Sequence, residues 1–238
     1  MKYTNMNNGL NFDIEKIEKC FRIVEKYRLH ASFSLETIRT SEICIHLLNN
    51  TKEGNIFQTC LNGLYLNCIV NIRKILEPNK NGKKCNLDFL INTIYENKDF
   101  FAKRHYDSDY NKERHSMSDY EAKGCLVLID CNETIKHEFA ERCREKCLNE
   151  IENVKRQWDN FKDSNDRNTL KICRDNLVHS FDIYPIDLPN TNDLERVLRI
   201  ITDFISYLEF IIMNSSSNTD ELDKEINRVS TNFWKKIQ

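Results

Sequence analysis

Residues 193–213, with the sequence DLERVLRIITDFISYLEFIIM, decide the fold class of this chain. Apolar side chains recur in them every three or four residues, which is the spacing of an α-helix and not the alternation of a strand. Arg199, Asp203 and Glu209 interrupt the apolar run, so the stretch is not a membrane span. It predicts a buried amphipathic helix that is capped by Asp193.

The same spacing predicts helices along most of the chain. Only five glycines and three prolines occur, which disfavours all-β folds with their frequent turns. We therefore predict an all-α protein, one domain of seven to nine helices. Besides 193–213, the predicted helices cover residues 12–29, 34–48, 53–76, 86–95, about 120–158, a stretch from 168 or 169, and 219–236.

Some details of these helices depend on single residues. Ser34 is predicted to begin the second helix, because serine is favoured at helix N-termini. Residues 97–123 are dense in charge and fit a solvated helix, a mobile loop or an inserted hairpin, while residues 125–129 alone have the composition of a strand. The helix over 53–76 is predicted to bury Ile56, Cys60, Leu64, Cys68, Ile72 and Ile75.

The charge balance and the cysteines limit the class of protein. Lys and Arg number 35 against 37 Asp and Glu, a net charge of −2, which argues against binding nucleic acid by bulk charge but leaves a local basic site open. The ten cysteines mostly lie in apolar helical patterns, and residues 1–8 are polar with no apolar region behind them. We therefore expect a cytoplasmic protein with reduced thiols and no membrane span.

The sequence contains no motif for a metal or a nucleotide cofactor. Cys143 and Cys147 would share a helix face, with His137 earlier in the same helix, but no Cys-x-x-Cys pair and no second ligand pair accompanies them. Glycine-rich phosphate loops and the Gly-x-Ser-x-Gly nucleophile motif are absent too. We therefore expect no cofactor and no metal site.

The segment RDNLVH, residues 174–179, carries the candidate chemistry. At about 100° per residue, Arg174 and His179 flank one broad face of a predicted helix. Asp175 precedes His179 by four residues, so its carboxylate can accept a hydrogen bond from the imidazole and fix the tautomer. This set suits metal-free RNA cleavage, with His179 moving protons and Arg174 binding phosphate oxygens. The alternative is a helix with a surface Arg–Asp pair and a capping histidine.

The segment resembles the Arg-polar-x-x-x-His signature of HEPN domains, all-helical domains of many prokaryotic toxins and antiviral ribonucleases. Over residues 30–212 the order of features also resembles the abortive-infection branch of that family. These features are an N-terminal helical pair, a long helix ending in NIRKILEP (71–78), a short LDFLI helix (87–91), and WDNFK (158–162) before the motif. The resemblance implies a metal-independent ribonuclease, often a homodimer whose two motifs face each other across one cleft.

On this resemblance we expect a HEPN-like helical bundle with additional helices, in three parts. These are an N-terminal helix over 1–30, a HEPN-like domain over 31–213 with a charged insertion at about 97–123, and a linker with an amphipathic helix over 214–238. In a subset of HEPN toxins, a partner enzyme modifies a tyrosine two residues after the histidine. Here that residue is Phe181, so control by that route is not expected.

The remaining candidate residues would hold RNA or a partner. Tyr184, Lys103, Arg104 and Arg114 are expected to line the cleft and bind RNA, and Asn176 to contact RNA or the dimer partner. The expected partners are an RNA substrate, a second copy of the chain, and an antitoxin or another defence-system component. The alternative function is a non-catalytic helical binding module that partners a nucleotidyltransferase, an effector or RNA.

Overall fold

The computed structural model of the chain describes residues 13–41, 52–77, 85–121, 132–164, 190–214 and 219–236, with backbone alone at 52–53, 109, 111–121, 132–135 and 219–221. This part of the chain contains seven α-helices and no strand, so the predicted all-α class is confirmed. The helices are α1 (Ile14–Thr40), α2 (Lys52–Leu76), α3 (Leu87–Glu96), α4 (Lys98–Glu121), α5 (Asn132–Lys162), α7 (Thr191–Met213) and α8 (Thr219–Lys235).

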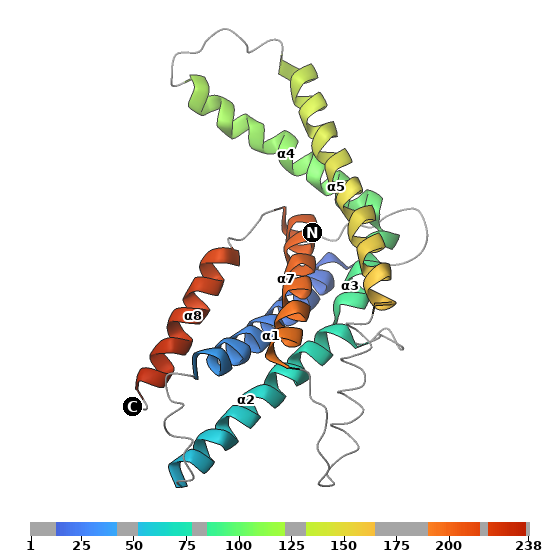
Figure 1. Ribbon diagram of the computed structural model, residues 1–238. Helices are drawn as coiled ribbons and strands as arrows, with labels where there is room; N and C mark the ends of the chain where they lie inside the picture. Colours follow the sequence, from blue (N-terminus) through green and yellow to red (C-terminus); the bar gives the residue numbers. More distant parts are fainter. Residues whose placement is uncertain are drawn as a thin grey trace.

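Helix α1 lies at the centre of the molecule and packs against α2, α7 and α8 (Figure 1). It is one uninterrupted helix, so the prediction of a second helix that begins at Ser34 is wrong. The Ser34 hydroxyl donates to the His30 carbonyl, 2.9 Å away, instead of capping a new helix. Because neither glycine nor proline occurs between residues 14 and 40, nothing interrupts the backbone.

The prediction of helix α2 is confirmed, but its buried face is only partly as expected. Cys68, Ile72 and Ile75 are buried against the main core, whereas Ile56 is 66% exposed and Cys60 is also exposed. In the N-terminal half of α2 the buried side chain is Phe57, one residue further along than predicted. Its ring meets Trp234 of α8 edge-on at 5.2 Å, so this half of α2 packs on α8.

Helix α7 provides much of the apolar core, as its sequence predicts. The buried side chains of α7 include Leu194, Ile201, Phe204 and Ile211. The N-cap is Asn190, whose side chain accepts from the Asp193 backbone N–H at 2.9 Å. Asp193 is therefore the third residue of the helix, and its predicted role as the cap is wrong.

Helices α4 and α5 form an antiparallel arm that extends beyond the body made by α1, α2 and α7 (Figure 1). Lys98 pairs with Glu152 at 2.5 Å, and further along α4 the Tyr106 hydroxyl meets His137 at 3.1 Å. The prediction of one helix from Tyr120 to Trp158 is therefore wrong, because α4 ends at Glu121. Of the three structures left open for residues 97–123, the helix is found.

Other predictions concern residues that the structure does not describe. The strand pattern at 125–129 and the helix from 168 lie outside the described residues, as does the predicted packing of that helix on 193–213. The short helix after Asn86 is confirmed as α3, and the terminal amphipathic helix as α8. None of the described helices combines the length and the apolar character that a membrane span requires.

Candidate functional site

The whole of the predicted catalytic segment lies outside the described part of the chain. Arg174, Asp175, Asn176, His179 and Tyr184 all fall within residues 165–189. The structure describes the two ends of that segment, Ser164 just after α5 and Asn190 at the start of α7. What can be described of the candidate site is therefore the set of contacts that hold these two ends, together with the surroundings of the basic residues of α4.

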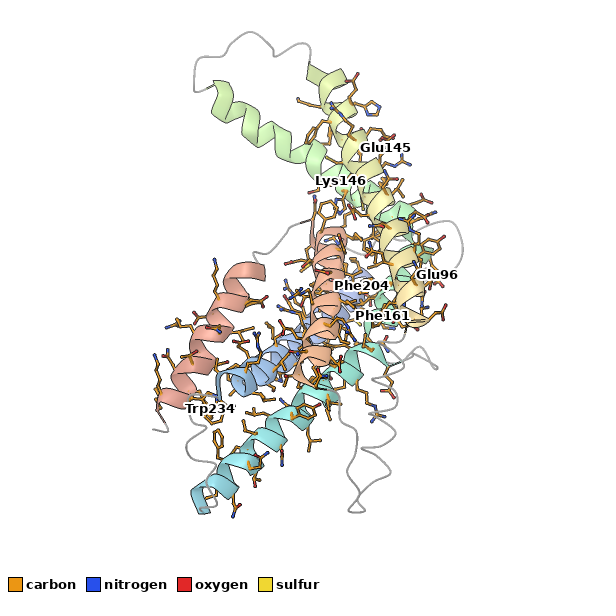
Figure 2. The ribbon with its side chains drawn as sticks, viewed as in Figure 1. Glu96, Glu145, Lys146, Phe161, Phe204 and Trp234 are labelled. Carbon is orange, nitrogen blue, oxygen red and sulfur yellow. The ribbon has the colours of Figure 1, made fainter. Side chains whose placement is uncertain are left out.

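An aromatic cluster fixes the C-terminal end of α5 against α7. The Trp158 ring stacks on Phe161, with 5.7 Å between centroids, and meets Phe204 of α7 edge-on at 5.5 Å. Figure 2 shows Phe161 and Phe204 close together at the α5–α7 interface. Trp158 is 1% exposed, so the last turns of α5 belong to the protein core.

A polar contact ties the same end of α5 to α3. The Trp158 indole N–H donates to Asp88 Oδ1 at 3.0 Å, and Lys162 Nζ lies 3.4 Å from the same oxygen. Lys155 and Lys162 also lower the pKa of Asp159, which keeps that carboxylate charged beside them. Helices α3, α5 and α7 therefore hold the point where the motif segment begins.

The other end of the segment is held by the start of α7. Asn190 has extended backbone and caps the helix, and Leu194 one turn later is fully buried. Because the cap satisfies a backbone N–H of the first turn, α7 starts at a defined residue. The residue that follows the motif segment is exposed, and the chain is therefore anchored in the core one turn later.

Two of the basic residues predicted on α4 are described, and they differ in their surroundings. Lys103 is exposed. Arg104 Nη1 donates to the Ile212 carbonyl at 2.7 Å, and its Nη2 pairs with Glu18 at 2.9 Å. Arg114 lies in α4 at a position where the structure describes the backbone alone. The structure places Lys103 and Arg104 on the arm, and their role in RNA binding stays a prediction.

His105 and Arg104 together satisfy the C-terminal end of α7. His105 is 1% exposed, its Nε2 lies 3.1 Å from the Ile211 carbonyl, and its ring packs on Phe210 at 4.8 Å. The last carbonyls of a helix have no partner within it and favour cationic or donor groups nearby. These contacts join the arm to the body at one end of α7.

The residues considered for a metal site differ in their surroundings. Cys147 is buried, and desolvation raises the pKa of its thiol to about 12. His137 is exposed and its Nδ1 is bonded to Tyr106. No group of three His, Cys, Asp or Glu side chains with the arrangement of a metal site occurs among the described residues. Burial likewise raises the pKa of the Cys68 thiol to about 12, so these two thiols are poor nucleophiles.

A pocket of about 250 Å³ lies between α1, α7 and α8. Arg39 reaches Glu36 at 3.3 Å and Glu195 at 3.7 Å, and Arg199 also lies 3.7 Å from Glu195. These charges largely neutralise one another and join α1 to α7. The pocket therefore presents no field of one sign that would select a charged ligand.

Sequence reasoning missed an aromatic cluster on the arm. Tyr106 and Tyr110 of α4 stack with their planes 8° apart, and Tyr106 also contacts His137 of α5. The four-residue spacing of the two tyrosines is visible in the sequence, but it has meaning only once residues 97–121 are known to be helical. The approach of His137 depends on the pairing of α4 with α5, which the sequence alone did not predict.

Comparison with known proteins identifies a family for the chain. The HEPN family model described as AbiU2 matches residues 27–233. The match runs from the middle of α1 to near the end of α8, so it includes both ends of the motif segment and the segment itself. No curated protein and no solved structure matches the chain.

Proposed function

Because the chain belongs to the HEPN family of AbiU2, the abortive-infection branch, we propose that it is a metal-independent RNA endonuclease. The observation that carries this proposal is the Arg-polar-x-x-x-His motif at 174–179, which lies inside the matched region. The motif segment is anchored at Ser164 and Asn190 by core helices. A rigid support on both sides favours a fixed geometry of reacting groups.

The proposed step needs a proton carrier and a group that binds the phosphate. His179 takes the proton of the ribose 2′-hydroxyl while the 2′-oxygen attacks the phosphorus and the bond to the 5′-oxygen breaks. The leaving 5′-oxygen gains a proton, so the products are a 2′,3′-cyclic phosphate and a 5′-hydroxyl. Arg174 binds the non-bridging oxygens as charge develops on them, and Asp175 orients the imidazole.

A homodimer would complete this chemistry. One motif offers one imidazole, whereas the step removes a proton at one oxygen and delivers one at another. A two-fold dimer that brings two motif segments together supplies a second His179 and a second Arg174 to the same cleft. Light scattering gives the oligomeric state, and cleavage assays give the specific activity across a range of protein concentrations. A composite site should lose specific activity at the concentrations where the dimer dissociates.

The defence-related role is proposed on the same basis. We infer that RNA cleavage by this chain limits the growth of an infected cell, with an antitoxin or another defence component restraining it. The proposed contacts to the RNA backbone are Lys103, Arg104 and Arg114 of α4. Of these, the side chain of Lys103 is exposed and can reach a phosphate. Tyr184 and Asn176 are the proposed contacts within the motif segment.

The test is an RNA digest by the purified full chain in the presence of EDTA. Wild type should cleave single-stranded RNA, and His179→Ala should lower the rate by ~10²–10⁴-fold, the usual contribution of general acid–base catalysis. Arg174→Lys should also be severely impaired, since lysine keeps the charge but loses the planar fork. Asp175→Asn should be milder, because an amide oxygen still accepts a hydrogen bond.

Matched controls separate catalysis from folding. His30→Ala and Arg22→Lys change exposed residues of α1 and should leave cleavage unchanged. Loss of cleavage in EDTA with recovery in Mg²⁺ contradicts the metal-independent step. If His179→Ala and Arg174→Lys both cleave like wild type, the nuclease proposal fails and the helical binding module is the better account.

A further inference from the structure

We propose that one side of the α4–α5 arm, formed by Lys103, Tyr106, Tyr110 and His137, is a stacking surface for the bases of single-stranded RNA. This inference rests on the proposed ribonuclease function and adds to it a substrate-binding site on the arm. We call these four residues the arm stack. Three of them carry an aromatic ring and the fourth carries a positive charge, and all four lie on the same side of the arm.

The helical register brings three of the four residues together. Lys103, Tyr106 and Tyr110 follow one another at intervals of three and four residues on α4, which places them on one stripe of the helix. The rings of Tyr106 and Tyr110 have centroids 6.0 Å apart and planes 8° apart. At this separation no third ring fits between them, so a base would stack on an outward ring face.

The fourth residue comes from α5 and fixes the orientation of the stack. The Tyr106 hydroxyl and His137 Nδ1 are 3.1 Å apart, and the two rings meet edge-on at 5.8 Å with planes 85° apart. Two ring contacts and one hydrogen bond restrict the rotamer of Tyr106. A ring held in place before binding loses little conformational entropy when a base stacks on it.

The tyrosines are not needed to fill the interior of the arm. Its buried side chains lie on other stripes and include Phe101 and His105 of α4 with Ala140 and Cys147 of α5. Tyr106 and Tyr110 are partly exposed, and Lys103 and His137 are exposed. The arm stack is therefore a surface feature, accessible to a ligand in the chain as it stands.

The chemistry of the arm stack fits single-stranded RNA. Bases of any identity present a π-face that stacks on tyrosine or histidine, and a lysine beside the rings attracts the phosphates. Bases in a duplex are already stacked and paired, so their faces cannot reach such a surface. The exposed aliphatic side chains Ile56, Leu66 and Val70 lie on α2, outside the arm, whereas the large exposed apolar side chain of the arm, Phe139, is itself aromatic.

The position of the arm stack predicts how it contributes to cleavage. His137 lies near the start of α5 and Ser164 just beyond its end, so at ~1.5 Å per residue they are about 40 Å apart along the helix. We therefore expect the groups of the arm stack to hold RNA away from the reacting phosphate. They bind the substrate equally in the ground and transition states, which changes KM and leaves kcat unaltered.

The test measures binding of a fluorescent single-stranded RNA of about 20 nucleotides by anisotropy. The full chain carries His179→Ala, so that the RNA stays intact. Tyr106→Ala with Tyr110→Ala should weaken binding by on the order of 10- to 100-fold, as expected for lost base stacking. Tyr106→Phe with Tyr110→Phe should lose much less affinity, because the rings remain and only the hydrogen bond from Tyr106 to His137 is removed. Phe233→Ala on α8 is the control, an exposed aromatic side chain outside the arm that should not matter.

Several results would overturn the inference and leave the proposed ribonuclease function unaffected. Unchanged RNA binding by the double alanine variant overturns it, and so does an equal loss in the phenylalanine pair. Duplex RNA that binds as tightly as the single strand excludes the base-stacking account. In each case wild-type cleavage of RNA still supports the nuclease. If wild type neither binds nor cleaves RNA, both proposals fail together.

A second variant and a kinetic readout cover the case in which the alanine pair does not fold. Lys103→Glu changes an exposed side chain, so folding should be retained, as far-UV circular dichroism can show. It should weaken RNA binding several-fold and reduce the salt dependence of the affinity. In the catalytically competent chain the same change should raise KM with kcat unchanged. Wild-type affinity of Lys103→Glu overturns the inference.

Discussion

Two aromatic clusters join helices of this molecule, one at Phe161 and Phe204 and the other at Trp234 (Figure 2), and they differ in the extent of the apolar core around them. The first, Trp158 with Phe161 and Phe204, joins α5 to α7 and lies within the main apolar core. The second, Trp234 with Phe57, joins α8 to α2 and is a separate small cluster with only partly buried leucines around it. Both indoles are nearly fully buried and both donate a hydrogen bond.

The difference indicates which parts of the fold depend on one another. Removing the first cluster affects α3, α5 and α7 together, because Asp88 of α3 accepts from the Trp158 indole. Removing the second affects α8, whose other contacts to α1 are mostly polar, such as Ser230 with Thr37 at 3.2 Å. The main core therefore supports both ends of the motif segment, while α8 packs beside it through a smaller cluster, and we expect α8 to separate before the rest unfolds.

Trp158→Ala should produce the largest loss of stability and would test the first half of this comparison. Removing a buried tryptophan typically costs ~3–5 kcal/mol, and for a chain of this size that lowers Tm by roughly 10 °C. Thermal unfolding by circular dichroism measures it. Trp158→Phe keeps a ring against Phe161 and Phe204 but loses the contact to Asp88, so it should cost clearly less. A Tm of Trp158→Ala equal to wild type would show that the cluster is not part of the core.

Trp234→Ala should have a smaller and local effect. The loss of stability cannot exceed the free energy with which α8 docks on the rest of the chain, because we expect the chain to release that helix and keep the rest folded. Hydrogen exchange should show faster exchange of α8 amides with α7 unchanged, and the free energy of unfolding should fall by less than in Trp158→Ala. The comparison fails if the amides of α7 lose protection to the same degree as those of α8.

The main core was largely predictable, because apolar spacing depends on local sequence alone. The extents of α2, α3 and α8 follow the periodicity closely, and so does the apolar face of α7. Helix boundaries were less predictable where a polar side chain can make either of two hydrogen bonds. Ser34 can cap a helix or bond back one turn, and the burial of its side chain against α2 favours the second use.

The arm was the part that local sequence could not predict. Residues 98–121 are polar and weakly amphipathic, so their helix is stabilised by α5 and by contacts such as that of Arg104 with α7. His105 looks like a surface residue in the sequence, but it is buried at the C-terminal end of α7. The candidate motif at 174–179, in contrast, was proposed from the spacing of its residues together with the resemblance to HEPN domains, and its catalytic role stays a prediction.

The most direct test of the account is the chemistry of the RNA ends that the full chain produces in EDTA. Attack by the 2′-hydroxyl, with His179 moving the proton, predicts 2′,3′-cyclic phosphate and 5′-hydroxyl ends, which mass spectrometry of the fragments distinguishes. The same fragments should be nearly absent with His179→Ala and abundant with His30→Ala. Fragments with 3′-hydroxyl and 5′-phosphate ends, or cyclic phosphate ends formed equally by His179→Ala, would contradict the central claim.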